Sequence, residues 1–302
     1  MSKIMSGGGI LFAAALLLAG CSGRKETTVG TPGNPLVVVF SPEHVPQGTD
    51  EPLLFIANYL SGRTGLSVEA KTSVSSMQAI NMLGEGKADM AFLTTEEYLV
   101  AREEYAVNAA LQVLRRGKES EYEGVILTRA SGGPKNTAAL AGAKFAFADP
   151  YSISGFFLPS VFLKKAGIKV EPVFAGGHEA AVKALLDGRA AAAATYAAAV
   201  SKRPELRVLA VTGTAPNGPV AARRGLLPEK LKAVEAALIA LPDTPEGKMA
   251  IGAVADITGF RPVPQDVYRA EHERIRSAGK SVYDLLPDGW QIRQLNEPYM
   301  PY

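Results

Sequence analysis

Apolar runs of strand length alternate with amphipathic segments of helix length along most of this chain. Leu36–Phe40, Leu66–Ala70 and Ala88–Leu93 have the length and apolar content of strands, and Glu51–Thr64 and Ser75–Leu83 carry apolar side chains at helical spacing. Short apolar runs predict buried strands, and strands that alternate with helices usually pair in parallel. The alternation therefore predicts an α/β fold with mostly parallel sheets that carry helices on both faces.

The alternation continues far enough to require more than one sheet. Thr95–Tyr105 is a third predicted helix. Further strands are predicted at 111–114, 124–127, 144–148, 169–174, 190–195 and 207–212, and further helices at 154–166, 178–186, 228–241 and 264–278. A chain of 302 residues can bury two cores of ordinary domain size. We therefore expect two lobes, and in such chains a small ligand binds in the cleft between them.

Composition and motifs exclude several classes of protein. The net charge is +2 and basic residues are spread along the chain, whereas nucleic-acid-binding proteins concentrate them. One cysteine allows no intramolecular disulfide and no thiolate metal site. The sequence has no His-Glu-x-x-His, no P-loop and no Gly-x-Ser-x-Gly motif. We expect no nucleic acid partner, no metal, no cofactor and no catalysis.

The N-terminus has the pattern of an exported lipoprotein. The apolar run Ile10–Ala19 is too short to span a bilayer as a mature helix. It ends in Leu18-Ala19-Gly20-Cys21, which resembles a bacterial lipobox, in which the cysteine is lipidated and becomes the first mature residue. We predict a signal peptide at 1–20, a lipid anchor on Cys21 and a flexible tether at 21–35. The alternatives are an ordinary secretory signal with an incidental cysteine, or a buried core helix.

Residues 149–155 (Asp-Pro-Tyr-Ser-Ile-Ser-Gly) join a predicted strand to a predicted helix and favour an anion site. The first N–H groups of a helix have no partner within it, and the helix dipole favours negative charge there. Ser152 and Ser154 add hydroxyl donors, and Gly155 lets backbone approach a ligand closely. The alternative is a serine that only caps the helix.

Two more strand-to-helix turns carry donors of the same kind. Gly176-Gly177 precede a predicted helix that begins at His178, whose ring can donate to an anion or have a structural role. Thr94 and Thr95 lie at a similar turn in the other predicted lobe. Because three such turns are stronger evidence together than singly, we expect them to meet at one pocket for a small anion.

Two acidic pairs also fall at ends of predicted elements. Glu43 and His44 follow the first strand, where Glu43 either contacts the ligand or lies in a solvated loop. Glu96 and Glu97 begin a helix, where the dipole stabilises carboxylates. A carboxylate directed at an anion would repel it, so the orientation of these two side chains bears on the hypothesis.

Four segments match, in order along the chain, the pattern of one family. They are Gly86-Lys87-Ala88-Asp89-Met90-Ala91, Asp149-Pro150 with Ser152-Ile153-Ser154-Gly155, Gly177-His178-Glu179-Ala180-Ala181-Val182 with Leu186-Asp187-Gly188-Arg189-Ala190, and Pro216-Asn217-Gly218-Pro219-Val220 with Ala222-Arg223-Arg224-Gly225-Leu226. In these segments the chain resembles the phosphate-, phosphite- and phosphonate-binding proteins of ABC transporters, which have the type 2 periplasmic-binding-protein fold.

The resemblance implies a two-lobed periplasmic-binding-protein-like clamp joined by two hinge crossovers. Lobe one would be discontinuous, with residues 35–116 and 215–302, and lobe two would hold residues 120–212.

For the site, the resemblance implies that Ser152, Ser154 and Gly155 hold phosphoryl oxygens and that His178 donates a further hydrogen bond. Tyr98 would wall the pocket or lie in the core.

Three positions depart from the family pattern. Ile153 replaces a threonine, and Thr94-Thr95-Glu96-Glu97 replaces a turn rich in Gly and Pro. Tyr196 follows Thr195 where relatives carry an acidic or amide residue that can serve a ligand's amino group. Tyr196 would therefore close the cleft over a smaller ligand, or simply pack.

The function that we predict is that of an exported, lipid-anchored solute-binding protein outside the cytoplasm. It would act as a monomer, bind phosphate, phosphite or a phosphonate, and deliver it to an ABC permease. One alternative is the same fold as the sensing subunit of a signalling system. The other is an envelope hydrolase that uses Ser154 and His178, with Asp149 as the acid.

Overall fold

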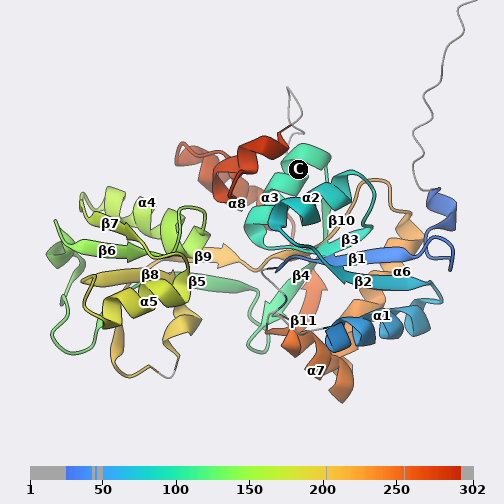
Figure 1. Ribbon diagram of the computed structural model, residues 1–302, viewed down its shortest axis with the longest axis horizontal. Coiled ribbons are helices and arrows are strands. Elements are labelled where there is room, and N and C mark those ends of the chain that lie inside the picture. The colour runs from blue at the N-terminus through green and yellow to red at the C-terminus, as the bar shows by residue number, and fades with distance from the viewer. Residues whose placement is uncertain (1–24, 43–44, 46–49, 202, 255, 294–302) are drawn as a thin grey trace, which may run out of the picture.

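The computed structural model describes residues 25–42, 45, 50–201, 203–254 and 256–293, and it has two lobes side by side (Figure 1). Each lobe contains one sheet with helices on both faces. We call the lobe with the six-stranded sheet lobe one and the lobe with the five-stranded sheet lobe two. The predicted signal peptide, Cys21 and Glu43-His44 lie outside the described residues.

The sheet of lobe one has the strand order β11-β4-β10-β3-β1-β2. Its strands are β1 (Leu36–Phe40), β2 (Val68–Thr72), β3 (Met90–Phe92), β4 (Asn108–Arg115), β10 (Pro219–Ala222) and β11 (Ile257–Pro262). β1 pairs in parallel with β2 and β3, in a register that sets Val38 opposite Ala70 and Met90. β10 is antiparallel to β3 and β4, and β11 is antiparallel to β4.

Alternating side chains of β1 serve two cores, one on each face of this sheet. Val37 and Val39 belong to the cluster under α2 (Ser76–Gly84) and α3 (Thr95–Tyr105). Leu36, Val38 and Phe40 belong to the opposite cluster, under α1 (Asp50–Thr64), α6 (Pro228–Ala240) and α7 (Pro245–Ala253). Burial of apolar side chains on both faces explains why the strand is a continuous apolar run rather than an alternating one.

The sheet of lobe two has the order β7-β6-β8-β5-β9. Its strands are β5 (Glu121–Arg129), β6 (Lys144–Phe147), β7 (Glu171–Phe174), β8 (Ala192–Tyr196) and β9 (Leu206–Pro216). β6 is parallel to β7 and β8, and β5 is antiparallel to β8 and β9. α4 (Leu158–Lys165) and α5 (His178–Leu186) lie on opposite faces of this sheet (Figure 1).

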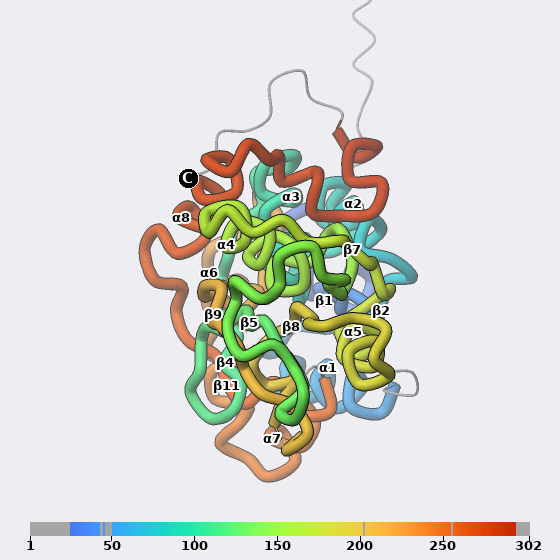
Figure 2. Tube along the Cα trace, turned by 90° about the vertical axis from the view of Figure 1, so that its left-hand side faces the viewer, coloured from blue at the N-terminus to red at the C-terminus, as the bar shows by residue number. Residues whose placement is uncertain are grey.

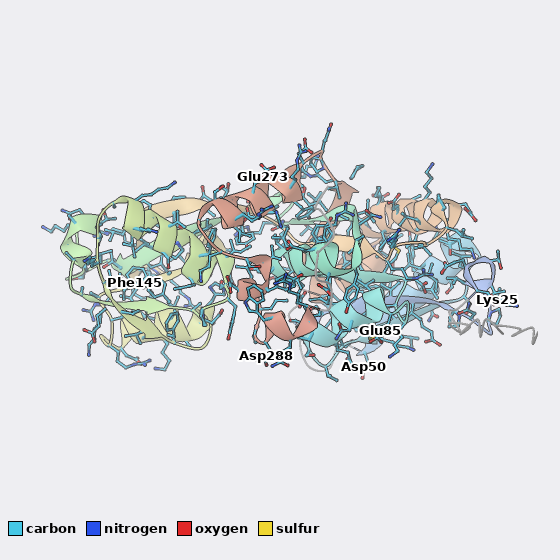
Figure 3. All side chains as sticks on the ribbon, turned by 90° about the horizontal axis from the view of Figure 1, so that it is seen from above. Lys25, Asp50, Glu85, Phe145, Glu273 and Asp288 are labelled. Carbon is cyan, nitrogen blue, oxygen red and sulfur yellow. The ribbon has the colours of Figure 1, made fainter. Side chains whose placement is uncertain are left out.

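The C-terminal segment packs against both lobes. It consists of α8 (Val267–Ser277) and two 3₁₀ turns, η7 (Val282–Leu285) and η8 (Gly289–Ile292). Figure 2 shows it along one edge of the molecule, and Figure 3 shows Glu273 and Asp288 midway between the lobes. Ile275 and Tyr283 share one apolar cluster with Ile153, Phe157 and Leu158 of lobe two. The lobes are therefore joined by packing as well as by the chain crossovers at 116–120 and 217–218.

Two expectations about the fold need correction. Both sheets are mixed rather than mostly parallel, because β10 and β11 of lobe one and β5 and β9 of lobe two run against their neighbours. Residues 25–35 are not a free tether. Val29 is 2% exposed, Glu26 pairs with Arg223, and Lys230 donates to the carbonyl groups of residues 26, 27 and 29. Lys25 lies at the end of lobe one that is farthest from lobe two (Figure 3).

Candidate functional site

A cleft of about 790 Å³ lies between the lobes and is lined by all three predicted strand-to-helix turns. Lobe one contributes Thr94, Thr95 and Glu96 at the start of α3. Lobe two contributes Ser152 and Ser154 before α4, and Gly176, Gly177 and His178 at the start of α5. The carboxyl ends of β3, β6 and β7 bring these turns to the cleft, which is where open sheets bind ligands.

Residues 152–155, which we call the α4 start, are held in shape by local hydrogen bonds. Ser152 is the N-cap, and its Oγ accepts from the N–H of Gly155 at 2.9 Å. The carboxylate of Asp149 accepts from the N–H groups of Tyr151 and Ser152, each at 2.8 Å. A π-helical turn, Ile153–Phe157, then leads into α4. The Asp-Pro segment therefore orients the turn through the Asp149 carboxylate.

Ser154 has a free hydroxyl group at the cleft wall. The residue is 3% exposed and lines the cleft, and among the described residues none hydrogen-bonds its side chain. The Ser154 hydroxyl can therefore donate to a ligand oxygen in the cleft, which makes Ser154 a strong candidate donor.

His178 lies between two hydroxyl groups. Its Nε2 is 3.2 Å from Ser152 Oγ and its Nδ1 is 3.0 Å from Thr195 Oγ1. The edge of its ring meets the ring of Tyr196, with centroids 4.9 Å apart. Burial lowers the pKa of His178, although Asp149 and Glu179 oppose this change. The ring is therefore neutral near pH 7, and it orients the Ser152 hydroxyl rather than supplying a positive charge.

This pairing does not support the hydrolase alternative. The histidine contacts Ser152 and not Ser154, and its other nitrogen meets the hydroxyl of Thr195 and not a carboxylate. A triad acid would need to accept a hydrogen bond from that second nitrogen, but Thr195 lies there and Asp149 accepts from backbone N–H groups. Ser154, His178 and Asp149 are therefore not arranged for nucleophilic catalysis.

The lobe-one residues divide between cleft and core. Thr94 caps α3 in a capping box with Glu97 and lines the cleft. Thr95 also lines the cleft, but its hydroxyl donates to the carbonyl of Pro216 at 2.7 Å, which fixes α3 to the crossover after β9. Tyr98 does not wall the pocket. It is 2% exposed, and its ring packs on Tyr268 with centroids 4.8 Å apart.

Gly155 is required for packing rather than for contact with a ligand. A Cβ at this position would lie 2.4 Å from the Cβ of Ala148 and 3.0 Å from Cε1 of His178. Its N–H is already bonded to Ser152. The glycine therefore allows the α4 start to approach β6 and His178, and it supports the site from behind.

Glu96 extends across the cleft to lobe two. Its Oε1 accepts a hydrogen bond from the N–H of Ile153 at 3.1 Å. Burial, with smaller contributions from Glu97 and Glu271, raises the pKa of Glu96 to about 7. The sequence predicts that both glutamates stabilise the dipole of α3. This fits Glu97, but it does not predict the contact between Glu96 and Ile153.

Arg115 and Tyr122 line the cleft and were not identified from the sequence. They lie at the facing ends of β4 and β5, where the chain first crosses between the lobes. Burial lowers the pKa of Arg115, and burial raises that of Tyr122. The charged stretch 115–123 between two predicted strands was the available signal. An arginine at this place gives the cleft a cation as well as neutral donors.

A second hollow of about 740 Å³ adjoins the cleft along the crossovers and shares Arg116, Glu121 and Tyr122 with it. Glu119 and Glu123 add carboxylates there, and none of the three donor turns reaches it. It is therefore poorly suited to an anion. Within the described residues no group of His, Cys, Asp and Glu could hold a metal ion, and no helix has the length and apolarity to cross a bilayer.

The comparisons with known proteins agree with this geometry. The family model described as "ABC transporter, phosphonate, periplasmic substrate-binding protein" matches residues 38–268. The phosphate-import protein PhnD of Mycolicibacterium smegmatis is 27% identical over 194 residues, which are 58% of this chain and 60% of that protein's length.

Solved structures show the fold. PhnD1 from Prochlorococcus marinus, in complex with methylphosphonate, has a TM-score of 0.64 at 17% identity, over 82% of this chain and 100% of that one. A binding protein component of an ABC phosphonate transporter from Pseudomonas aeruginosa has a TM-score of 0.63 at 15% identity, over 81% and 87%. XAC2383 from Xanthomonas citri has a TM-score of 0.65 at 18% identity, over 80% and 99%.

These likenesses confirm the predicted two-lobed binding-protein fold. The family model covers well over half of the chain, in the region that contains all three donor turns. The family consists of transport receptors and not of enzymes, as the sequence predicts. This chain belongs to the family of periplasmic substrate-binding proteins of phosphonate ABC transporters, and it is therefore an extracytoplasmic protein.

Proposed function

We propose that this protein captures a small phosphorus oxyanion or phosphonate in the cleft between its lobes and delivers it to an ABC importer in the membrane. The observation that carries the proposal is the convergence of neutral donors on one cleft. The Ser154 hydroxyl, the Ser152–His178 pair and the cap at Thr94 all line it. These neutral donors can bond to the oxygens of an anion, and Arg115 at the same cleft adds a positive charge.

The ligand class follows from the donors and from the relatives. A small tetrahedral phosphorus group carries up to four oxygens. These oxygens can accept hydrogen bonds from the hydroxyl and N–H donors of both lobes. One relative is named as a phosphate-import protein, and one similar structure holds methylphosphonate. Ile153 supplies no hydroxyl and Tyr196 supplies no carboxylate, so an aminoalkyl group has no partner at those positions. Phosphate, phosphite and small alkylphosphonates are the expected ligands.

Closure of the lobes about the crossovers at 116–120 and 217–218 would complete the site. Thr94 belongs to lobe one and Ser154 to lobe two, so closure of the clamp would bring both toward one ligand. A ligand that binds the closed form better shifts the population toward it. Docking of the closed form on a permease would then link capture to transport.

Calorimetry tests this proposal directly. Purified protein is titrated with phosphate, phosphite and methylphosphonate, and with sulfate as the matched tetrahedral anion. We expect a Kd of about 1 μM or tighter for at least one phosphorus ligand. His178→Ala should weaken that binding at least tenfold, because the Ser152 hydroxyl loses its orientation. The absence of heat with every phosphorus ligand would rule the proposal out.

Membrane attachment through a lipid on Cys21 is part of the same proposal. The lipobox-like sequence Leu18–Cys21 supports it. Residues 25–35 pack on lobe one, which leaves only residues 22–24 between the lipid and the folded body. In a cell that processes lipoproteins, the protein should sediment with membranes, and Cys21→Ser should release it. Equal sedimentation of both forms would contradict anchoring through Cys21.

A further inference from the structure

The donors at the α4 start already hold an oxygen atom that comes from lobe one. Glu96 is the second residue of α3, and its carboxyl group accepts the N–H of Ile153 at 3.1 Å. Ile153 begins the helical turn that leads into α4, so its N–H is among those that have no partner within the helix. The carboxyl group therefore occupies one of the positions that an anionic ligand needs.

The surroundings of Glu96 disfavour its negative charge. On its own helix it faces Glu97, and from α8 it faces Glu271. Tyr122 of β5 also interacts electrostatically with it, and Arg115 of β4 and Arg274 of α8 act on Tyr122 in turn. In the described part of the chain no lysine or arginine forms an ion pair with Glu96. Burial is the main cause that raises its pKa to about 7.

We propose that Glu96 couples ligand binding to proton uptake: the neutral carboxyl group admits the anion and donates its O–H to a ligand oxygen, whereas the carboxylate competes with the anion for the donors at the α4 start. The proposal rests on the anion-binding function proposed above and specifies how that site is regulated. The only covalent bond that forms is the O–H bond of the carboxyl group, and its proton comes from solvent.

The protonation equilibrium sets the size of the effect. Only the protonated fraction of the protein binds the anion well, so the apparent Kd is the intrinsic Kd divided by that fraction. With a pKa of about 7, the fraction is about one half at pH 7 and about one tenth at pH 8. Affinity should fall about fivefold between these pH values. Titration of His178 does not cause this change in affinity, because burial keeps the pKa of His178 below its ordinary value and its ring stays neutral between pH 7 and pH 8.

The test is calorimetric titration with methylphosphonate at pH 7 and pH 8, in two buffers that differ in ionisation enthalpy. Ionisation of the ligand itself contributes equally to every variant. Glu96→Gln keeps a carbonyl oxygen for the N–H of Ile153 but cannot titrate. Glu123→Gln removes an exposed carboxylate at the second hollow and is the matched control. At pH 8 the wild type and Glu123→Gln should take up about one proton more than Glu96→Gln.

The outcomes separate the two proposals. Equal proton uptake and equal pH dependence in the wild type and in Glu96→Gln would overturn the coupling while leaving the receptor function intact. Failure of every variant to bind any phosphorus anion, at pH 6 as well as at pH 8, would instead refute the function. If Glu96→Gln does not fold, Glu96→Ala replaces it in the comparison. It too is expected to lose the fivefold change.

Discussion

Replacing Ser154 with alanine removes one donor from the cleft and leaves the fold intact. Ser154 lines the cleft, and no described residue hydrogen-bonds its hydroxyl group. Its loss breaks no hydrogen bond within the protein. Alanine is also a better helix former than serine by a few tenths of a kcal/mol. The free energy of unfolding should therefore stay within about 0.5 kcal/mol of the wild-type value.

The expected effect on binding is much larger. A hydrogen bond from a neutral hydroxyl to a charged oxygen contributes about 1.5–3 kcal/mol. At 1.4 kcal/mol per tenfold change, the Kd should rise between about tenfold and 150-fold. The expected change lies in affinity alone.

Ser152→Ala is the natural comparison. It removes the cap bond to Gly155 and the contact with His178. Loss of a cap destabilises a helix by about 1 kcal/mol. This variant should therefore lose both affinity and stability, whereas Ser154→Ala loses affinity only. Calorimetry with methylphosphonate and urea unfolding without ligand measure the two quantities separately.

Two results would refute the reasoning. If Ser154→Ala binds every phosphorus anion within twofold of the wild type, the ligand does not lie at the α4 start. If Ser154→Ala destabilises the protein as much as Ser152→Ala does, the hydroxyl has a structural partner after all. The first result tests where the ligand binds, and the second tests whether the Ser154 hydroxyl lacks a partner within the protein.

Three other substitutions test parts of the structure that support the cleft. Gly155→Ala should destabilise the protein by about 1–3 kcal/mol and weaken binding, because its Cβ would lie 2.4 Å from that of Ala148; an unchanged urea midpoint would contradict this packing. Arg223→Met should destabilise by about 3–5 kcal/mol, because it removes the cation that pairs with the buried carboxylate of Asp89. The affinity of the folded fraction should not change, and calorimetry after refolding checks this. For Glu96, the pKa rises from 4.5 to about 7 on folding, so the folded state binds its proton more tightly. This tighter proton binding adds at most about 3 kcal/mol to the free energy of unfolding. The added stability is fully present below pH 4.5 and is lost as the pH rises through 7. Between pH 5 and 8 the wild type should lose more stability than Glu96→Gln, and parallel pH curves would show that the carboxyl group is well solvated.

Elements with strong local signals were predicted from the sequence almost to the residue. α3 begins after Thr94, where threonine and Glu97 form a capping box, and α5 begins after a glycine pair. These signals act within one turn of the chain, so no knowledge of the fold is needed to interpret them. The same local reasoning located the three donor turns of the cleft.

Elements that depend on distant partners were missed. β10 has four residues and is central in its sheet only because β3 and β4 pair with it on either side. β11 contains Gly259 and ends in Pro262, so it lacks a strand pattern of its own and is fixed by β4. The antiparallel direction of such strands follows from the two crossovers between the lobes, and local periodicity does not contain that information.

The adjacent residues Glu96 and Glu97 show which contacts can be predicted from a local sequence pattern and which cannot. Glu97 accepts the N–H of Thr94 and the hydroxyl of Ser41 within lobe one, and the capping-box spacing predicts its position. Glu96 has the same chemistry one residue earlier, but the helical rotation turns its side chain toward the cleft and to Ile153 of lobe two. The bond to Ile153 exists only where the two lobes meet, so no local pattern could predict it. If the lobes open when the ligand leaves, that bond must break.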